Sequence, residues 1–280
     1  MPEDSRRKSI LGFRLIWISL ITLTAALLAT GLSIALPIYL NREAIRVVRD
    51  FGGEVVTGVS GPEWLRERLG EKYSDWFEVV SRVNLHDRHP DRMCMEALSR
   101  FSSLETLYLH NTTIGDEDLA CLVGLNNIKS LALAHTRITD DGLRYLGTLT
   151  SLEWIGLQGT AITGNGFSSL EKLPRLRTVV LTSSRVTDEG LEAITSLRTL
   201  ERLEIDRTRV GDAGLRTIDR LQNLTELNLN STAVTDEGLR RLHGLPNLKS
   251  VHASRSQVTD AGYDELQRAL PDVQININRR

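Results

Sequence analysis

Cysteine is scarce in this sequence. Only Cys94 and Cys121 occur among 280 residues, so the fold cannot rest on a framework of disulfides. Aromatic residues are also few, at 5%, and 34 basic residues almost balance 36 acidic ones, which leaves a net charge of −2. Surfaces that bind nucleic acid are strongly basic and often carry stacking aromatics, so the composition predicts no nucleic-acid partner.

Motifs of catalysis are lacking as well. The sequence contains no GxSxG nucleophile elbow, no HExxH zinc motif and no glycine-rich phosphate loop. We therefore predict no catalytic residue, no metal ligand and no cofactor, and we do not expect an enzyme. The apolar fraction of 41% and the charged fraction of 25% are those of a folded protein.

One long stretch contains no charge at all. Residues 15–36 read LIWISLITLTAALLATGLSIAL, and a helix of these 22 residues would span the hydrocarbon core of a bilayer. This predicts a transmembrane helix after a short basic tail, residues 1–14. The tail carries four basic residues and the downstream flank three, which favours a cytoplasmic tail with the rest of the chain outside the cytoplasm. A cleaved signal peptide is the alternative, although its apolar region is usually only about 7 to 15 residues long.

A period of 24 residues dominates the rest of the chain. Seven units begin at Leu104 and recur every 24 residues up to Leu248, each close to LxxLxLxxTxVTDxGLxxLxxLxx. A degenerate unit begins at Val80, and a truncated one ends the sequence. We number the places of a unit from 1 to 24, starting at its first residue. Such a period indicates a repeat architecture over residues 80–280.

Each unit has the pattern of one strand followed by one helix. Alternating apolar residues at places 4 and 6 predict a short strand, and apolar residues spaced by three, at places 16, 19 and 22, predict a helix. One such unit cannot bury its own core, but stacked units can. We therefore predict an α/β solenoid with a curved parallel sheet on its concave side and helices on its convex side. Residues 41–79 would form a juxtamembrane linker and an N-terminal cap.

The most regular part of the unit is the segment VTDxGL at places 11 to 16. We expect its first residue in the core, and its threonine and aspartate as caps for the first turn of the helix. The glycine would be needed where two units, or a strand and a helix, approach closely. The hydroxyl of place 9 is expected to bond the backbone of the adjacent unit. One unit departs from the pattern and reads Ile162-Thr-Gly-Asn-Gly-Phe167, with Gly164 in place of the aspartate, which indicates function or strain.

These units resemble those of the leucine-rich repeat family, and the resemblance covers about 200 of the 280 residues. The whole chain is similar to membrane-anchored bacterial leucine-rich repeat proteins, in which a stretch like FGGEVVTGVSGPEWLRERLG lies between anchor and repeats. The resemblance implies the solenoid fold, the anchor and a role in binding a protein or peptide.

Side chains at places 3, 5, 7 and 8 are expected to face the concave side, where such solenoids usually bind their partners. Small residues around Trp154 could leave a shallow depression beside an exposed indole, and aromatic side chains in depressions often anchor interfaces. The alternative is that these side chains serve no partner and that Trp154 packs flat on its neighbours. The candidate partner-binding residues are Asn84, His86, Tyr108, His110, His135, Trp154 and Gln158.

Two other functions are alternatives to a protein partner. A metal-dependent or other enzyme could use the region of His86, His110 and His135, although the spacing within HDRHPDRMC argues against convergence on one ion. A purely structural protein of the cell envelope would need no specific ligand. Cys94 and Cys121 lie in segments with helical spacing, which favours a buried structural role over catalysis.

Overall fold

The computed structural model describes residues 36–59, 63–69 and 78–277. The chain divides into two compact units, Met1–Glu43 and Ala44–Arg280, and the second unit contains the sheet. A helix covers residues 36–50. The predicted basic tail and the predicted transmembrane segment, residues 15–36, lie outside the described residues except for Leu36. Within the described ranges, no helix is long and apolar enough to cross a membrane.

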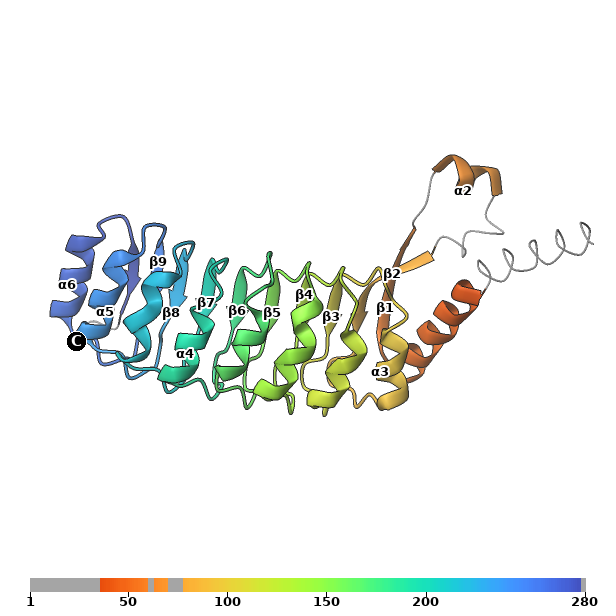
Figure 1. The fold of residues 1–280 in the computed structure, drawn as a ribbon, viewed down its shortest axis with the longest axis horizontal. Coiled ribbons are helices and arrows are strands. Elements are labelled where there is room, and N and C mark those ends of the chain that lie inside the picture. Colours follow the sequence, from red (N-terminus) through yellow and green to blue (C-terminus); the bar gives the residue numbers. More distant parts are fainter. Residues whose placement is uncertain (1–35, 60–62, 70–77, 278–280) are drawn as a thin grey trace, which may run out of the picture. The chain divides into compact units, whose positions relative to one another are not determined.

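Strands and helices alternate along most of the second unit (Figure 1). The strands are β1 (Glu54–Val59), β2 (Glu78–Asn84), β3 (Thr106–Tyr108), β4 (Ser130–Ala132), β5 (Trp154–Gly156), β6 (Thr178–Val180), β7 (Arg202–Glu204), β8 (Glu226–Asn228), β9 (Ser250–His252) and β10 (Gln274–Asn276). The helices, where η marks a 3₁₀ helix, are α2 (Glu63–Leu69), α3 (Arg92–Leu98), η2 (Asp116–Leu122), η3 (Asp140–Thr148), η4 (Asn165–Leu170), α4 (Asp188–Ile194), η5 (Gly214–Arg220), α5 (Asp236–Arg240), η6 (Arg241–Gly244) and α6 (Asp260–Ala269).

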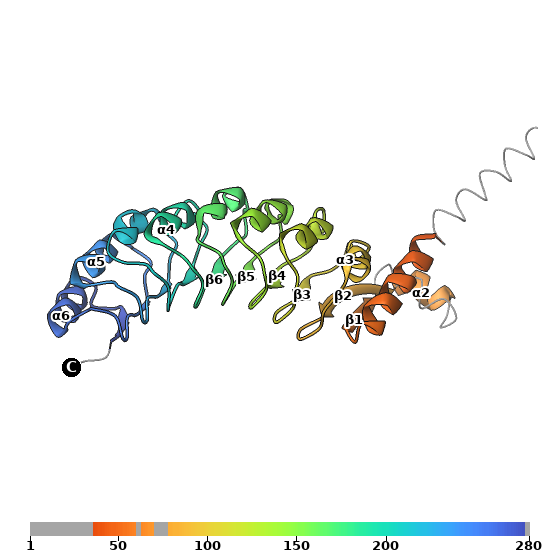
Figure 2. The ribbon, with the colours of Figure 1, turned by 90° about the horizontal axis from the view of Figure 1, so that it is seen from below.

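The described strands form one sheet in chain order, and the repeat period sets its register. From β2 to β10 each strand pairs in parallel with the next, so that Leu107 lies opposite Leu131 and Leu131 opposite Ile155. β1 is antiparallel to β2, with an irregularity between Val56 and Thr57. The strands of the repeats lie along the inner side of an arc and the helices along its outer side (Figure 2). The predicted solenoid is therefore confirmed.

The core is a continuous stack in which each unit contributes the same places. Leu131, Leu133, Ile138, Leu143 and Leu146 hold places 4, 6, 11, 16 and 19 of one unit, and each is fully buried. Burial of one such side chain stabilises the fold by about 1.5–3 kcal/mol relative to exposure. The repeated apolar places therefore explain both the register and the continuity of the core.

Several convex helices are tighter than an α-helix. η2, η3, η4 and η5 are 3₁₀ helices, whereas α4, α5 and α6 are α-helices. A 3₁₀ helix has 3.0 residues per turn, so every third residue lies on the same face. Because places 16, 19 and 22 recur at this spacing, the sequence pattern fits a 3₁₀ turn at least as well as an α-helical one.

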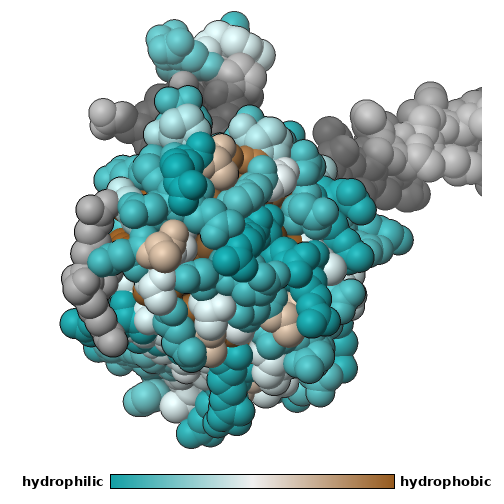
Figure 3. All heavy atoms as spheres, turned by 90° about the vertical axis from the view of Figure 1, so that its left-hand side faces the viewer, coloured by the Kyte–Doolittle hydropathy of each residue, from teal (hydrophilic) through white to brown (hydrophobic). Residues whose placement is uncertain are grey.

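Both ends of the repeat stack are closed. Ala44, Ile45 and Val48 are buried against the first repeat, and a Cβ on Gly53 would lie only 2.7 Å from Leu85 Cδ2. At the other end, the outer face of α6 is polar, and a view onto this end displays a mainly hydrophilic surface (Figure 3). An open solenoid needs such ends because a bare repeat would expose core side chains to water.

The aspartate of place 13 links its unit to the next one. Asp116 accepts hydrogen bonds from the N–H of Thr139 at 2.8 Å and from its hydroxyl at 2.7 Å. Asp212 binds Thr235 in the same way, at 2.8 and 2.6 Å. The prediction that these aspartates cap their own helices is wrong, because their partner is the threonine 23 residues later. The threonines do cap their own helices as predicted, at Thr139, Thr187, Thr235 and Thr259.

The glycine of place 15 lies against the aspartate of the preceding unit. A Cβ on Gly142 would lie 2.5 Å from Asp116 Oδ1, and a Cβ on Gly214 would lie 2.7 Å from Asp188 Oδ1. Both distances are too short for real Cβ contacts. The prediction that a close approach between neighbouring units excludes a β-carbon is therefore confirmed.

The irregular unit closes this gap with backbone instead of a carboxylate. Gly164 has a φ of 104°, and a Cβ placed on it would lie 2.6 Å from the Cα of Gly190 in the next unit. The N–H of Thr187 donates to the Thr163 carbonyl at 3.2 Å. The loss of the aspartate at Gly164 therefore has a structural reason, since two backbones pack where other units place a side chain.

The hydroxyl of place 9 bonds within its own unit. Thr112 Oγ1 donates to the Leu109 carbonyl at 2.6 Å, and Thr136 Oγ1 donates to the Leu133 carbonyl at 2.7 Å. The expected bond to the adjacent unit is therefore wrong, because the carbonyl three residues earlier is closer. Ser184 Oγ holds the same place and is buried without a hydrogen-bond partner among the described residues.

Candidate binding surface

The inner side of the arc is lined by places 3, 5 and 7, which alternate with buried side chains along each strand. Place 8 forms the corner at which the chain leaves the sheet. Its backbone is left-handed, with φ from 55° to 59°, at Asp87, Asn111, His135, Ser183, Arg207, Ser231 and Arg255. Few residues other than glycine, asparagine and aspartate favour this conformation. Because several units have serine or arginine at place 8, the sequence alone does not predict the left-handed corner.

Three of the predicted residues form one ring cluster at the N-terminal end of this surface. The imidazoles of His86 and His110 are stacked, with ring centroids 5.0 Å apart and an interplanar angle of 2°. The Tyr108 ring meets His110 edge-on, at 6.2 Å and 78°. The cluster follows from the repeat, because His86 and His110 both hold place 7 in neighbouring units whose strands pair in register.

Polar neighbours hold the His86 ring from one side. His86 Nδ1 lies 2.8 Å from Asp87 Oδ2, and the His86 N–H donates to Asn84 Oδ1 at 3.2 Å. Asn84 in turn donates from Nδ2 to Glu54 Oε2 on β1 at 3.3 Å. Hydrogen bonds with His86 and with Asn111 lower the pKa of Asp87, so this carboxylate stays ionised well into the acidic range.

His110 lies deeper in the surface and resists protonation. Burial lowers the pKa of His110, the charge of protonated His86 lowers it further, and Asp87 acts in the opposite direction. His135 adds a smaller effect that lowers the pKa of His110. Two unit charges at the 5.0 Å centroid distance of the stack repel by about 1 kcal/mol even in water, so double protonation of the stack is disfavoured.

The remaining predicted residues are packed on glycines. The Nδ1 side of the His135 imidazole lies over Gly159, whose φ is 65°. A Cβ on Gly156 would lie 3.1 Å from Trp154 Cζ2 and 2.9 Å from Gln158 Oε1. Trp154 is half-buried, because its indole fills the space over Gly156. Gln158 Oε1 is buried and has no hydrogen-bond partner in the described part of the chain.

A second polar cluster, which the sequence reasoning missed, lies toward the C-terminal end of the same surface. Asp206 is only 8% exposed, and its Oδ1 accepts hydrogen bonds from the Thr182 hydroxyl at 2.7 Å and from Asn228 Nδ2 at 3.2 Å. Arg202 bridges Glu204 at 2.9 Å and Glu226 at 3.0 Å. These residues hold places 3, 5 and 7 of consecutive units, so the same counting that selected His86 and His110 could have found them.

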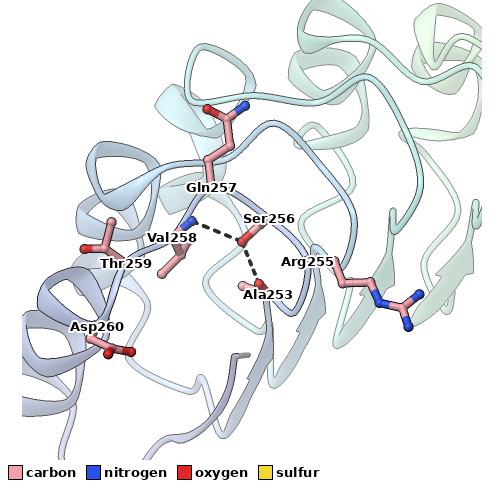
Figure 4. A pocket seen from close by; sticks show the side chains of 7 residues that line it. All are labelled: Ala253, Arg255, Ser256, Gln257, Val258, Thr259 and Asp260. Atoms are coloured by element: carbon pink, nitrogen blue, oxygen red, sulfur yellow. Dashed lines mark hydrogen bonds between the residues drawn. The ribbon is translucent and has the colours of Figure 1, made fainter. Parts of the chain in front are cut away.

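A hollow of about 450 Å³ lies at the corner after β9, away from the ring cluster (Figure 4). It is lined by Ala253 and residues 255–260. Ser256 Oγ donates to the Ala253 carbonyl at 2.5 Å and accepts from the Val258 N–H at 3.4 Å. None of the predicted candidate residues lines this hollow.

Neither a metal site nor a reactive thiol emerges from the described side chains. Within the described ranges, no group of three or more histidine, cysteine, aspartate or glutamate side chains could hold a metal ion. Burial raises the pKa of Cys94 to about 12, and it raises the pKa of Cys121 to about 12 as well. Both thiols therefore stay protonated near neutral pH, and Cys94 is buried whereas Cys121 is only partly buried.

The chain matches one family model and is similar to several solved structures. Residues 124–147, 172–194 and 220–242 match the family model described as leucine rich repeat. Among solved structures, internalin C2 of Listeria monocytogenes has a TM-score of 0.55 and 21% identity over 71% of this chain and 81% of its own. Another Listeria monocytogenes internalin, InlF, has a TM-score of 0.46 and 18% identity over 65% of each chain. No curated protein sequence matches the chain.

An open solenoid with parallel strands on its inner side and short helices outside is a repeat scaffold with an extended inner face. Three segments of the repeat region match the leucine rich repeat model, and the fold is similar to that of internalin C2, in line with the resemblance in the sequence. The metal-dependent or enzymatic alternative is not favoured by this assignment, because leucine-rich repeat domains are typically protein-interaction modules.

Proposed function

We propose that the repeat domain binds a protein or peptide segment across its concave face. The observation that supports this most directly is the ring cluster of His86, Tyr108 and His110, which lies on the sheet surface instead of in the core. Aromatic side chains are frequent anchors of protein interfaces because they bury much area at little cost in conformational entropy. No nucleic-acid partner is proposed, since the net charge of −2 offers no excess of basic residues.

The surface next to the cluster suits an extended partner. Small residues follow the ring cluster on the next strands, namely Ala132 and Gly156, and a polar cluster around Asp206 lies beyond them. Strands are spaced by about 4.8 Å, so a segment crossing eight of them needs about ten extended residues at 3.3–3.6 Å each. Such a segment would meet rings first and hydrogen-bonding groups later.

We also propose that residues 15–36 hold the chain in a membrane with the repeat domain outside the cytoplasm. The support is the uncharged 22-residue stretch and the basic residues that precede it. A reporter that is active only outside the cytoplasm, fused to the C-terminus, is expected to be active. Activity of a reporter restricted to the cytoplasm at the same position would contradict this orientation.

Site-specific photo-crosslinking in cells tests the binding role. A photoreactive amino acid at Ser130, which holds place 3 on β4 beside the ring cluster, is expected to capture a discrete partner protein. The same group at Arg216, an exposed residue of η5 on the convex side, is the matched control. Tyr108→Ala is expected to reduce the Ser130 crosslink at least fivefold, because the ring is a central anchor.

Two outcomes would remove the proposal. Equal crosslinking from Ser130 and Arg216 would mean that the partner does not prefer the concave face over the convex one. A Ser130 crosslink that is unchanged by Tyr108→Ala, in a variant with an unaltered thermal transition, would exclude the ring cluster from the contact.

A further inference from the structure

We propose that the stacked His86–His110 pair makes the concave surface bind an acidic peptide segment, and that it binds this segment more tightly as the pH falls. The inference rests on the proposed function and adds the chemical class of the partner and its regulation. Its basis is geometric, because two imidazoles lie face to face on the inner surface with their ring centroids 5.0 Å apart.

Part of the hydrogen-bonding capacity of the stack is unused. His86 uses Nδ1 for Asp87, which leaves Nε2 free, and neither ring nitrogen of His110 has a hydrogen-bond partner among the described residues. Each ring nitrogen of a protonated histidine is a donor, and a carboxylate accepts at two oxygens. A carboxylate at the edge of the stack could therefore accept from a ring nitrogen of each imidazole and offset the repulsion between their charges.

The charged groups around the stack favour an anion once the imidazoles are protonated. The fixed carboxylates are Asp87 beside His86 and Glu54 on β1, and both are already engaged, by His86 and by Asn84. Arg82 lies on the same strand as Asn84, and Arg88 follows Asp87 and donates to the Gly52 carbonyl. The Tyr108 ring meets His110 edge-on, and His135 lies at the next corner.

Acidification adds positive charge at the stack. Repulsion between the two rings disfavours protonation of both in the free protein, and a carboxylate that accepts from both rings would offset this repulsion. Burial and neighbouring charge lower the pKa of His110 in the free protein, and a bound carboxylate would raise it again, so binding is coupled to proton uptake.

A peptide titration of the full chain in detergent micelles tests the inference. The probe is a fluorescent Gly-Ser-Glu-Gly-Ser-Glu-Gly-Ser peptide, and its control carries glutamine for glutamate. The glutamates stay ionised at pH 5.5, whereas acidification from pH 7.5 favours the charged form of histidine side chains in general. We expect at least tenfold tighter binding of the glutamate peptide at pH 5.5 than at pH 7.5, and less than a twofold change for the glutamine peptide.

Variants assign the effect to the stack. The His86→Gln and His110→Gln double variant is expected to reduce the pH dependence to less than threefold, while His243→Gln, an exposed histidine of η6, keeps it. Circular dichroism at both pH values checks that the double variant remains folded. Calorimetry in two buffers of different ionisation enthalpy is expected to detect proton uptake on binding at pH 6.5 in the unmodified chain only.

Several results would overturn the inference. Equal affinity at the two pH values, equal binding of the glutamine peptide, no binding of the glutamate peptide, or full pH dependence in the folded double variant would each do so. These results leave the crosslink from Ser130 as a separate test of partner binding. A specific crosslink without pH dependence would therefore refute the acidic-peptide inference while the proposed function stands.

Discussion

Replacement of Gly164 by aspartate would restore the motif that most units share, and we predict that it destabilises the protein. Gly164 has a φ of 104°, and a Cβ on it would lie 2.6 Å from Gly190 Cα and 2.7 Å from the Gly190 carbonyl carbon. In most other units the aspartate accepts from the N–H and hydroxyl of a threonine 23 residues later. Here the N–H of Thr187 already donates to the Thr163 carbonyl.

Two costs add to give the expected magnitude. A non-glycine residue at such a φ costs about 1–2 kcal/mol, and forcing a side chain into a packed contact costs about 1–3 kcal/mol more. We therefore expect Gly164→Asp to lower the free energy of unfolding by about 3 kcal/mol, and the melting temperature by about 6–12 °C for a domain of this size.

Gly211→Thr is the matched control, because it also restores the shared motif but at an open position. The nearest atoms to a Cβ on Gly211 are 3.8 Å away, and one of them is Asp188 Oδ2. Asp188 Oδ1 already accepts from the Gly211 N–H at 2.7 Å. A threonine hydroxyl there would complete the pair of bonds seen at Thr139, so we expect a gain of about 1 kcal/mol.

Urea denaturation followed by circular dichroism measures both changes. Both substitutions restore a residue of the shared motif, but Gly164→Asp should lower the free energy of unfolding and Gly211→Thr should raise it. If Gly164→Asp is neutral or stabilising, the backbone contact with Gly190 is not what excludes the aspartate. If Gly211→Thr also destabilises, the carboxylate of Asp188 is not available to a second donor.

Three further predictions follow from single contacts. Asp212→Ala leaves the N–H and hydroxyl of Thr235 without their acceptor and should cost about 1–3 kcal/mol in urea denaturation; a cost below 0.5 kcal/mol would contradict the link between units. Cys94, which is buried and whose pKa is raised to about 12 by burial, should react with a thiol reagent at pH 8 only as fast as the protein unfolds. The pKa of His110 is lowered in the folded state, so the unfolded chain binds that proton more readily. The free energy of unfolding should therefore fall as the pH drops below about 6.5. His110→Gln should make this fall smaller, which pH-dependent denaturation measures.

The fold could be predicted because its main causes are local and periodic. Apolar places repeated every 24 residues set the strand register and the buried stack, and a glycine repeated at a costly position indicated a close approach that the structure confirms. The role of the aspartates could not be read in this way. An aspartate after a threonine at a helix start resembles a cap within one unit, whereas its partner lies 23 residues later, across a distance that only the stacking of units defines.

The same distinction between periodic and non-periodic features applies to the binding surface. His86 and His110 share a place in neighbouring units, so the period alone brings their side chains to adjacent strands, and the stack follows from the register. Trp154 has no such partner, and its exposure depends on whether the indole turns toward solvent or over Gly156. Gly156 lies two residues later on the same face and has no side chain, so its backbone leaves a surface that the ring covers. The irregular motif near Trp154 is therefore explained by packing between units, and the ring cluster two units earlier is the stronger candidate for contact with a partner.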